Sequence, residues 1–314
     1  MLISRLQYRF ALVATSLVLF VLGLLYKTKA TVSLRLQLGN APNEPNGLNK
    51  PDDSKAWIYS GPEAEDKAVI LAKVRSEDVN WVFDYLQECV TQHRLYSCVC
   101  ADEDARPSWK QAIYYMDEPN EGMLHPPLNK GREAMAYLTF IIDHYHVLPS
   151  YMVFVHPHLR GWPEAWHTDS DDHDQINYIR SLRLEYLEQH GYANMRCIHD
   201  PGCPAEIQVD RQEDHRTAQH AMREAWPYMF GGNSTEIPKV IAQPCCSQFA
   251  ISKTQALKRS KADYEHYRQW LLDTPLDDAT SGRVFEYLWH VIFGQEAVRC
   301  PPLEQCRCEQ FGRC

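Results

Sequence analysis

The stretch AVILAKVRSEDVNWVFDYL, which runs from Ala68 to Leu86, decides the fold class. Its first six residues form an apolar run flanked by charge, which is the pattern of a buried β-strand. Ser76 follows and can cap a helix whose acidic first turn matches the positive end of the helix dipole. Apolar residues then recur at helical spacing, at Val79, Val82, Leu86 and Val90. A buried strand that passes directly into an amphipathic helix is typical of an α/β domain.

The same alternation continues beyond this stretch. We expect further strands at YSCVC (96–100), AIYYM (112–116) and YMVFVH (151–156), and a long helix from Gly131 to Tyr145. Strands that alternate with helices predict an α/β fold with a mostly parallel, Rossmann-like sheet and flanking helices. Ligands of such sheets bind outside the carboxyl ends of the strands. Chemistry is therefore expected in the loops after Lys73, Met116 and His156.

The second half of the chain is predicted to be mostly helical. Helical patterns cover 174–190, 210–226, 253–272 and 281–293, and a short strand, KVIAQ, covers 239–243. No linker after residue 65 is long enough to separate two domains. We therefore expect one α/β domain over residues 66–314, with a cysteine-rich tail.

The N-terminal segment is predicted to be a membrane anchor. Residues 10–26 carry no charge and, as a helix, cover about 26 Å, which is at the short end for a transmembrane span. We interpret 1–9 as a cytoplasmic tail, 10–26 as a transmembrane signal-anchor and 27–65 as a flexible stem rich in Asn, Pro and Gly. A short span suits the thinner membranes of the early secretory pathway. The alternative is a signal peptide cleaved near residues 28–30.

The cysteines indicate the compartment. All eleven follow the apolar segment, and four of them crowd the tail, at Cys300, Cys306, Cys308 and Cys314. This density favours disulfides in an oxidising lumen, and thus a single-pass protein on the lumenal side of the endoplasmic reticulum or Golgi. A zinc site in the tail is the alternative, but paired C-x-x-C spacing and nearby histidines are missing.

Two other cysteine pairs carry predictions of their own. Cys197 and Cys203 bracket IHDPG, a turn-forming sequence that can bring their sulfurs together. Cys245 and Cys246 are adjacent, so we expect each to pair elsewhere and not to form a redox-active couple.

The net charge of −9 argues against a nucleic-acid partner, because binding to phosphates requires clustered Lys and Arg. Anion binding is instead predicted locally, at NKGREAMAYL (129–138). Gly131 at a helix start lets the backbone approach a ligand closely, and Lys130 and Arg132 add positive charge beside the free N–H groups. These three residues are candidates to bind a diphosphate. The alternative is an ordinary helix start with two solvated cations.

A metal site is predicted in HPHLRGWPEAWHTDSDDHD (156–174). His156 and His158 lie two residues apart, so in extended chain they share a face, while Asp169 and Asp171 offer oxygen ligands suited to Mn²⁺ or Mg²⁺ with a substrate diphosphate. His167 lies between the two groups. The alternative is an acidic surface loop that caps the next helix.

A candidate general base lies in GRVFEYLWHVIFG (282–294). Glu286 stands on an otherwise apolar helix, where a carboxylate is costly unless it is partnered or functional. It can deprotonate an acceptor hydroxyl, and with His167 it forms our candidate catalytic pair. The alternative is a structural pair between Glu286 and either His290, four residues on, or an arginine.

Together these segments resemble a fungal family of uncharacterised single-pass membrane proteins, defined only as a domain of unknown function. The resemblance spans roughly residues 68–314 and rests on VILAKVRSEDVNW, LNKGREAMAYLTFIIDHY, MVFVHPHLRGWPEAWH, CCSQFAISK, GRVFEYLWHVIFG and the cysteine-rich tail. The layout also looks like nucleotide-diphosphate-sugar transferases, in which an acidic motif at a strand end holds the metal. This chain departs from that pattern, because His156-Pro157-His158 replaces the Asp-x-Asp.

The family resemblance implies a membrane-anchored protein. The likeness to sugar transferases implies a glycosyltransferase-like enzyme that takes a nucleotide sugar, with Mn²⁺ or Mg²⁺, and a glycan acceptor. The alternative is a non-catalytic lumenal factor for carbohydrate binding or assembly on a transferase-like scaffold. A third class is a metal oxidoreductase built on His156, His158 and His167.

Overall fold

The computed structural model describes residues 66–86, 109–117, 119, 122–231 and 236–314. The predicted tail, anchor and stem, the expected strand at 96–100 and the cysteines at 89, 98 and 100 lie outside these residues. Within the described ranges, no helix combines the length and the apolar character that a membrane crossing requires.

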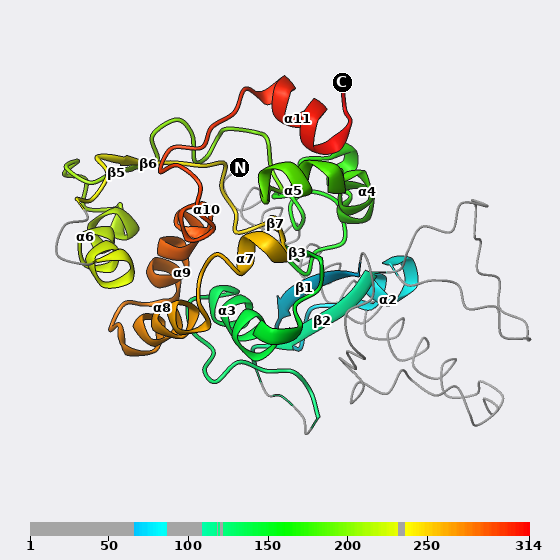
Figure 1. Ribbon diagram of the computed structural model, residues 1–314, viewed down its shortest axis with the longest axis horizontal. Coiled ribbons are helices and arrows are strands. Elements are labelled where there is room, and N and C mark those ends of the chain that lie inside the picture. The colour runs from blue at the N-terminus through cyan, green and yellow to red at the C-terminus, as the bar shows by residue number, and fades with distance from the viewer. Residues whose placement is uncertain (1–65, 87–108, 118, 120–121, 232–235) are drawn as a thin grey trace, which may run out of the picture. The chain divides into compact units, whose positions relative to one another are not determined.

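A five-stranded sheet forms the centre of the domain (Figure 1), with the strand order β2-β1-β3-β7-β4. The strands are β1 (Lys67–Lys73), β2 (Trp109–Tyr115), β3 (Tyr151–Val155), β4 (Tyr192–Asn194) and β7 (Phe249–Ser252). β1 pairs in parallel with β2 and β3, whereas β7 pairs antiparallel with β3 and β4. The α/β class is thus confirmed, but the prediction of a mostly parallel sheet is wrong. The sheet is mixed because β7 enters it in the opposite direction.

Helices cover both faces of this sheet and enclose two cores. Ala68, Ile70 and Ala72 of β1 point to one core, and Val69 and Leu71 point to the other, because successive side chains of a strand alternate between faces. The first core is built with α3 (Ala134–Asp143), α6 (Thr217–Phe230), α8 (Lys261–Asp273), α9 (Asp278–Glu286) and α10 (Trp289–Ile292). The second is built with α2 (Asn80–Leu86), α4 (Gln175–Ser181), α5 (Leu184–His190) and α11 (Leu303–Phe311).

The remaining elements are short. They are α7 (Lys253–Ala256), two 3-10 helices at Tyr145–Val147 and Asp171–His173, and a separate two-stranded ladder of β5 (Ile207–Gln208) and β6 (Val240–Ile241). Three predicted helices are each divided in two, since α4 and α5, α7 and α8, and α9 and α10 are separate. The second break has a clear cause, because Ser260 and Asp263 form a capping box that starts α8 anew.

Four disulfides join described cysteines, and they correct one predicted pairing. Cys197 bonds Cys306 and Cys203 bonds Cys300, so the IHDPG turn does not join Cys197 to Cys203. Cys308 bonds Cys314, and Cys245 bonds its neighbour Cys246. All four tail cysteines are therefore in disulfides, which agrees with the prediction of disulfides in the tail and not with the alternative of a zinc site.

The two long-range disulfides predict a non-additive stability. Cys197–Cys306 and Cys203–Cys300 are nested, six residues apart on each side. Loop-closure entropy makes the first such bond worth about 5 kcal/mol, but the second closes only the short segments between them, worth about 3 kcal/mol. We expect Cys197→Ala with Cys306→Ala, or Cys203→Ala with Cys300→Ala, to cost about 3 kcal/mol, and all four together more than the sum. Urea unfolding under non-reducing conditions measures this, and simple additivity of the two pairs contradicts it.

Candidate functional site

A cavity of ≈ 290 Å³ lies at the carboxyl end of β3, whose next residue, His156, lines it. Its wall comes from five segments that are distant in sequence: the turn before α3, the chain that follows β3, residues 201–206, the cysteine segment before β7, and α9. Two glycines bring the first and last of these together. A Cβ on Gly282 of α9 would lie 3.0 Å from the carbonyl oxygen of Gly131, and Gly131 itself has φ +66°. Small residues at this crossing therefore allow α9 to approach the start of α3.

Four of the predicted site residues line this cavity: Arg132, His156, His167 and Glu286. Glu286 is the last residue of α9, and its side chain is 18% exposed. Its Oε1 accepts a hydrogen bond of 2.7 Å from the backbone N–H of Cys246, and its Oε2 lies 3.9 Å from Nε of Arg283. Burial raises the pKa of Glu286 to about 7, against the lowering effect of the Cys246 N–H. Glu286 is therefore poised to exchange a proton near neutral pH.

The Glu286–His290 pair considered above does not form. His290 belongs to α10, and its Nε2 lies 3.0 Å from the carbonyl oxygen of Ala297. The break between α9 and α10 removes the shared helical face on which that pairing depended.

A second carboxylate, Glu133, also lines the cavity and was not predicted. It precedes the first residue of α3, and burial raises its pKa. The negative charge of Glu133 also contributes to the raised pKa of Glu286. A carboxyl group whose ionisation is disfavoured by a neighbouring carboxylate is a common feature of acid–base sites. The sequence could have indicated Glu133 as a site residue, because it directly follows the predicted anion-binding residue Arg132.

Three histidines cluster at the end of β3. The ring centroids of His156 and His167 are 4.5 Å apart, and the ring of His158 lies 6.2 Å from His167 and nearly parallel to it. Burial lowers the pKa of His156 to about 4 and that of His167 to about 3, and the neighbouring histidines contribute to both shifts. Both rings are therefore neutral at physiological pH. His156 Nε2 and His167 Nδ1 are buried without a hydrogen-bond partner among the described residues, so each is available to a ligand.

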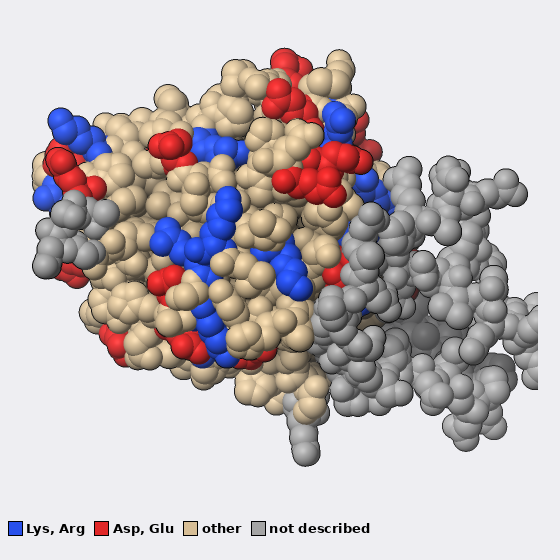
Figure 2. Space-filling model, in the orientation of Figure 1, with Lys and Arg blue, Asp and Glu red and all other residues tan. Residues whose placement is uncertain are grey.

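Two arginines give the cavity its positive charge. Arg132 and Arg283 both line it, and both side chains are exposed. On the face drawn in Figure 2, Lys and Arg side chains gather near the middle of the described part. Sequence reasoning missed Arg283, although it stands three residues before Glu286, one helical turn away on the same face.

The other predicted anion-binding groups point elsewhere. Lys130 Nζ donates to the carbonyl oxygen of Thr274, and the Gly131 N–H donates to Asp278 Oδ1 at 3.1 Å. Both therefore fasten the start of α3 to the chain around α9. Of the three residues, Arg132 alone lines the cavity.

Asp169 is held in a structural cluster instead of the cavity. Its Oδ2 accepts the backbone N–H groups of Cys197 and Ile198 at 3.0 Å, and its Oδ1 lies 2.8 Å from Nη2 of Arg307 on α11. The Asp169 side chain is 3% exposed, whereas that of Asp171 is fully exposed and lies 3.4 Å from Arg313. Asp169 thus anchors the C-terminal segment, whereas Asp171 makes only an exposed ion pair with it.

The structure does not bring the four predicted metal ligands together. His156 and His158 lie at the cavity end of the segment, while Asp169 and Asp171 are engaged by Arg307 and Arg313. Within the described ranges, a group of three ligand atoms within 4.8 Å of one another occurs at Cys245, Cys246 and Glu286. However, the two sulfurs of that group are bonded to each other, which leaves only the carboxylate to coordinate an ion.

The bond between Cys245 and Cys246 corrects another prediction, since each was expected to pair elsewhere. Both line the cavity. The sequence shows the two cysteines side by side, separated from FAIS by Ser247 and Gln248, but nothing in that pattern tells which sulfur each one bonds.

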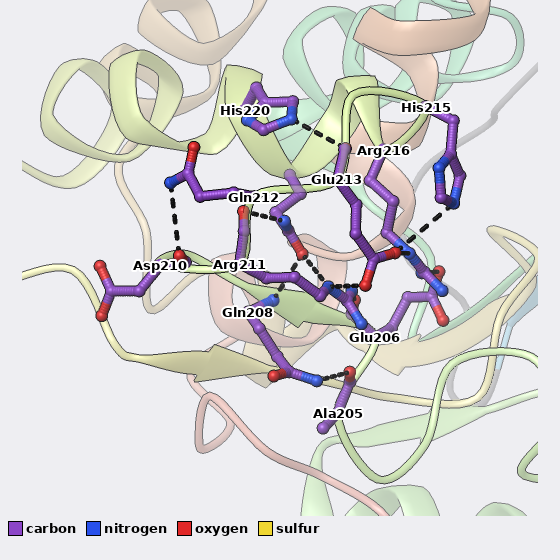
Figure 3. A network of polar contacts seen from close by, with 11 residues as sticks. Ala205, Glu206, Gln208, Asp210, Arg211, Gln212, Glu213, His215, Arg216 and His220 are labelled. Carbon is purple, nitrogen blue, oxygen red and sulfur yellow. Dashed lines mark hydrogen bonds and ion pairs between the residues drawn. The ribbon is translucent and has the colours of Figure 1, made fainter.

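A polar network borders the cavity at Glu206 (Figure 3). The Glu206 carboxylate lies 2.8 Å from Arg216 Nη1, and the same arginine contacts Glu213 at 3.1 Å through Nε. Arg211 joins the network by donating to Gln219 at 2.9 Å. Arg216 directly precedes α6 and pairs with the Glu206 carboxylate. This wall of the cavity is therefore held in place, and the charge of Glu206 is balanced by that of Arg216.

The described residues thus form a mixed α/β domain with a carboxylate-bearing, arginine-rimmed cavity at its strand ends. Residues 69–309 match the family described as "Protein of unknown function (DUF3431)". Because this match covers more than half of the 314 residues, the chain belongs to that family. Comparisons with curated proteins and with solved structures gave no match.

The contrast between the two aspartates gives a testable prediction. Asp169→Asn removes the charge that holds Arg307 and weakens two buried backbone hydrogen bonds, so it should lower the free energy of unfolding by about 3 kcal/mol. Asp171→Asn is the matched control, and because this side chain is exposed the change should stay within about 0.5 kcal/mol. Urea unfolding of both variants measures the difference. Equal, small effects contradict the structural role of Asp169.

Proposed function

We propose that the domain is a glycosyltransferase-like enzyme that moves a sugar from a nucleotide-diphosphate donor to an acceptor hydroxyl. The observation that carries the proposal is Glu286, a carboxyl with a pKa near 7 in a cavity that also presents Arg132 and Arg283. A general base works best when its pKa lies near the working pH. The cavity also lies outside the carboxyl end of β3, the side of an α/β sheet on which ligands bind.

The proposed reaction uses these groups in three ways. The Glu286 carboxylate takes the proton of the acceptor hydroxyl, and the acceptor oxygen then bonds to the anomeric carbon of the donor sugar. The bond from that carbon to the diphosphate oxygen breaks, and its electron pair stays on the leaving nucleoside diphosphate. Guanidinium groups stabilise such developing phosphate charge, which is the role we assign to Arg132 and Arg283.

The neutral imidazoles of His156 and His167 serve a different purpose. Each has a buried nitrogen without a partner in the described part of the chain, so each can hydrogen-bond a sugar hydroxyl or a phosphate oxygen. Their lowered pKa values keep them uncharged near neutrality, so they orient substrate without adding charge. A cavity of ≈ 290 Å³ is at the small end for ligand sites and suits the sugar and diphosphate, with the nucleoside lying outside.

The cellular setting is part of the same proposal. We infer a single-pass fungal membrane protein, anchored by residues 10–26 with its domain on the lumenal side of the endoplasmic reticulum or Golgi. The four disulfides support an oxidising compartment. Anchor, stem and α/β domain is also a common arrangement among sugar transferases.

A second candidate is a non-catalytic lumenal carbohydrate-binding or assembly factor. It is favoured by one observation, the replacement of a strand-end Asp-x-Asp by His156-Pro157-His158 together with the structural use of Asp169. Glycan binding that survives Glu286→Gln unchanged, with no turnover of any nucleotide sugar, favours this candidate.

The role of Glu286 predicts a pH profile. The active form is ionised, so kcat/KM should rise as the pH increases through about 7 and level off above it. Glu286→Gln should lower kcat by about 10²–10⁴-fold and remove this dependence, because the amide cannot accept the proton. Glu304→Gln, at an exposed position of α11, is the control and should keep the wild-type profile. A profile for Glu286→Gln that still rises near pH 7 contradicts the assignment.

The arginine rim predicts donor binding without a metal. Arg132→Ala should raise KM for the nucleotide sugar about tenfold or more, since a charge-assisted contact to phosphate is worth about 1.5–3 kcal/mol. Lys261→Ala, an exposed cation of α8 that pairs with Glu265, is the control. Transfer should also persist when a chelator replaces added Mn²⁺. Loss of transfer on chelation, restored by Mn²⁺, contradicts the metal-free arrangement.

A further inference from the structure

The disulfide between Cys245 and Cys246 lies on the cavity wall, in the segment between β6 and β7. Both side chains are nearly enclosed by protein, with 2% and 6% exposed, and both line the cavity that holds Glu286. The bond is therefore part of the cavity wall, and the cavity is its route to small molecules in solution.

This bond differs in kind from the two long-range disulfides. Those join residues 109 and 97 positions apart and restrict the unfolded chain, which is the usual source of disulfide stabilisation. Cys245 and Cys246 are one position apart, so their bond closes no chain loop. A structural staple is therefore a poor explanation for it, and its effect is expected to be local.

The local backbone is held in an unusual conformation. Cys246 has φ +94° and Ser247 has φ +51°, both in the left-handed region that side-chain-bearing residues seldom occupy. Two hydrogen bonds fix the segment, from the Cys245 N–H to the carbonyl oxygen of Pro201 at 3.1 Å and from the Cys246 N–H to Glu286. Such conformations cluster at functional sites, where the surrounding structure determines them.

The disulfide is coupled to Glu286 through a single peptide group. The peptide that joins the two cysteines carries the N–H that donates to Glu286 Oε1 at 2.7 Å. The carboxylate oxygen and both sulfurs also lie within 4.8 Å of one another. Opening the S–S bond releases that peptide from the ring that now restrains it, so the hydrogen bond to Glu286 depends on the oxidation state.

We propose that Cys245–Cys246 is a reversible thiol–disulfide exchange site, reached by small thiols through the cavity, whose oxidation state sets the hydrogen bond between the Cys246 amide and Glu286. The ligand class is a small dithiol or monothiol. This inference goes beyond sugar transfer and stands on the position of the bond, whatever substrate the cavity takes.

The exchange balances as ordinary thiol chemistry. A thiolate of the dithiol attacks one cysteine sulfur, and the S–S electron pair leaves on the other sulfur, which takes up a proton. The second thiol of the reagent then displaces the attached cysteine, which is protonated in turn. The cystine gains two electrons and two protons, and the dithiol becomes a disulfide. Glu286 lies close enough to the sulfurs to hold one of these protons.

The first experiment maps reduction bond by bond. The folded protein is equilibrated in buffers of reduced and oxidised dithiothreitol at increasing ratios, alkylated, and digested for peptide mass analysis. We expect Cys245 and Cys246 to be alkylated at ratios that leave Cys197–Cys306 and Cys203–Cys300 intact, with unchanged near-ultraviolet circular dichroism. Alkylation of Cys245 and Cys246 only together with those two bonds, or only after unfolding, overturns the proposal.

The second experiment measures the coupling to Glu286. Its carboxyl carbon is titrated by NMR in oxidised and in dithiothreitol-reduced protein, with Glu286→Gln to assign the signal. Reduction should shift the titration midpoint upward, because the Cys246 N–H that favours the charged carboxylate is released. The charged groups that face Glu286, namely Glu133, Arg132 and Arg283, are the same in both states.

A variant that lacks both sulfurs completes the test. Cys245→Ala with Cys246→Ala should show the reduced protein's midpoint at every dithiothreitol ratio, and reduction of the wild type gives the same comparison without relying on the variant's folding. Identical midpoints in the oxidised and reduced wild type overturn the coupling. None of these readouts uses sugar transfer, so their failure is distinct from failure of the proposed function.

Discussion

The antiparallel pairing of β7 with β3 is the constraint on which the cavity depends. Phe249, the first residue of β7, pairs with Phe154 near the end of β3. The segment that precedes β7 therefore lies at the same edge of the sheet as the residues that follow β3, and the Gln248 side chain accepts the His156 N–H there at 3.1 Å. Had β7 run parallel to β3, its preceding segment would lie at the opposite edge, and the cysteines would be far from His156 and Glu286.

Burial then determines the charge of the groups that this pairing brings together. It raises the pKa of Glu286 and of Glu133 and lowers that of His156 and His167, so carboxyls and imidazoles alike move toward their neutral forms. Arginine keeps its charge under the same conditions. The cavity consequently has a positive rim over a weakly charged interior, an arrangement that attracts anions and leaves a proton acceptor within it. The proposed transfer reaction relies on these two properties together.

Strong apolar runs made much of this fold predictable. The expected strands at Ala68–Lys73 and Tyr151–His156 match β1 and β3 within one residue, because a fully buried strand needs a continuous apolar run. The four residues FAIS are too few to predict a strand from the sequence, so β7 was missed. The direction of a strand in a sheet is set by tertiary contacts and has no local sequence signal, so the mixed sheet was missed as well. Likewise, Lys130 and Arg132 are equivalent cations in the sequence, and only the turn at Gly131 directs one to Thr274 and the other to the cavity.

The histidine- and aspartate-rich segment shows why residue types alone do not tell which side chains share a site. One end, at His156 and His167, faces the cavity, while Asp169 is drawn into the cluster that holds α11. Arg307 has a raised pKa because of its hydrogen bond to Asp169, and disulfides bind the same C-terminal segment to Cys197 and Cys203. Asp169 thus has a structural role, and its partner Arg307 lies about 140 residues away in the sequence. Because Asp169 is used to hold the C-terminal segment, in the proposed reaction the charge that meets the diphosphate comes from arginine.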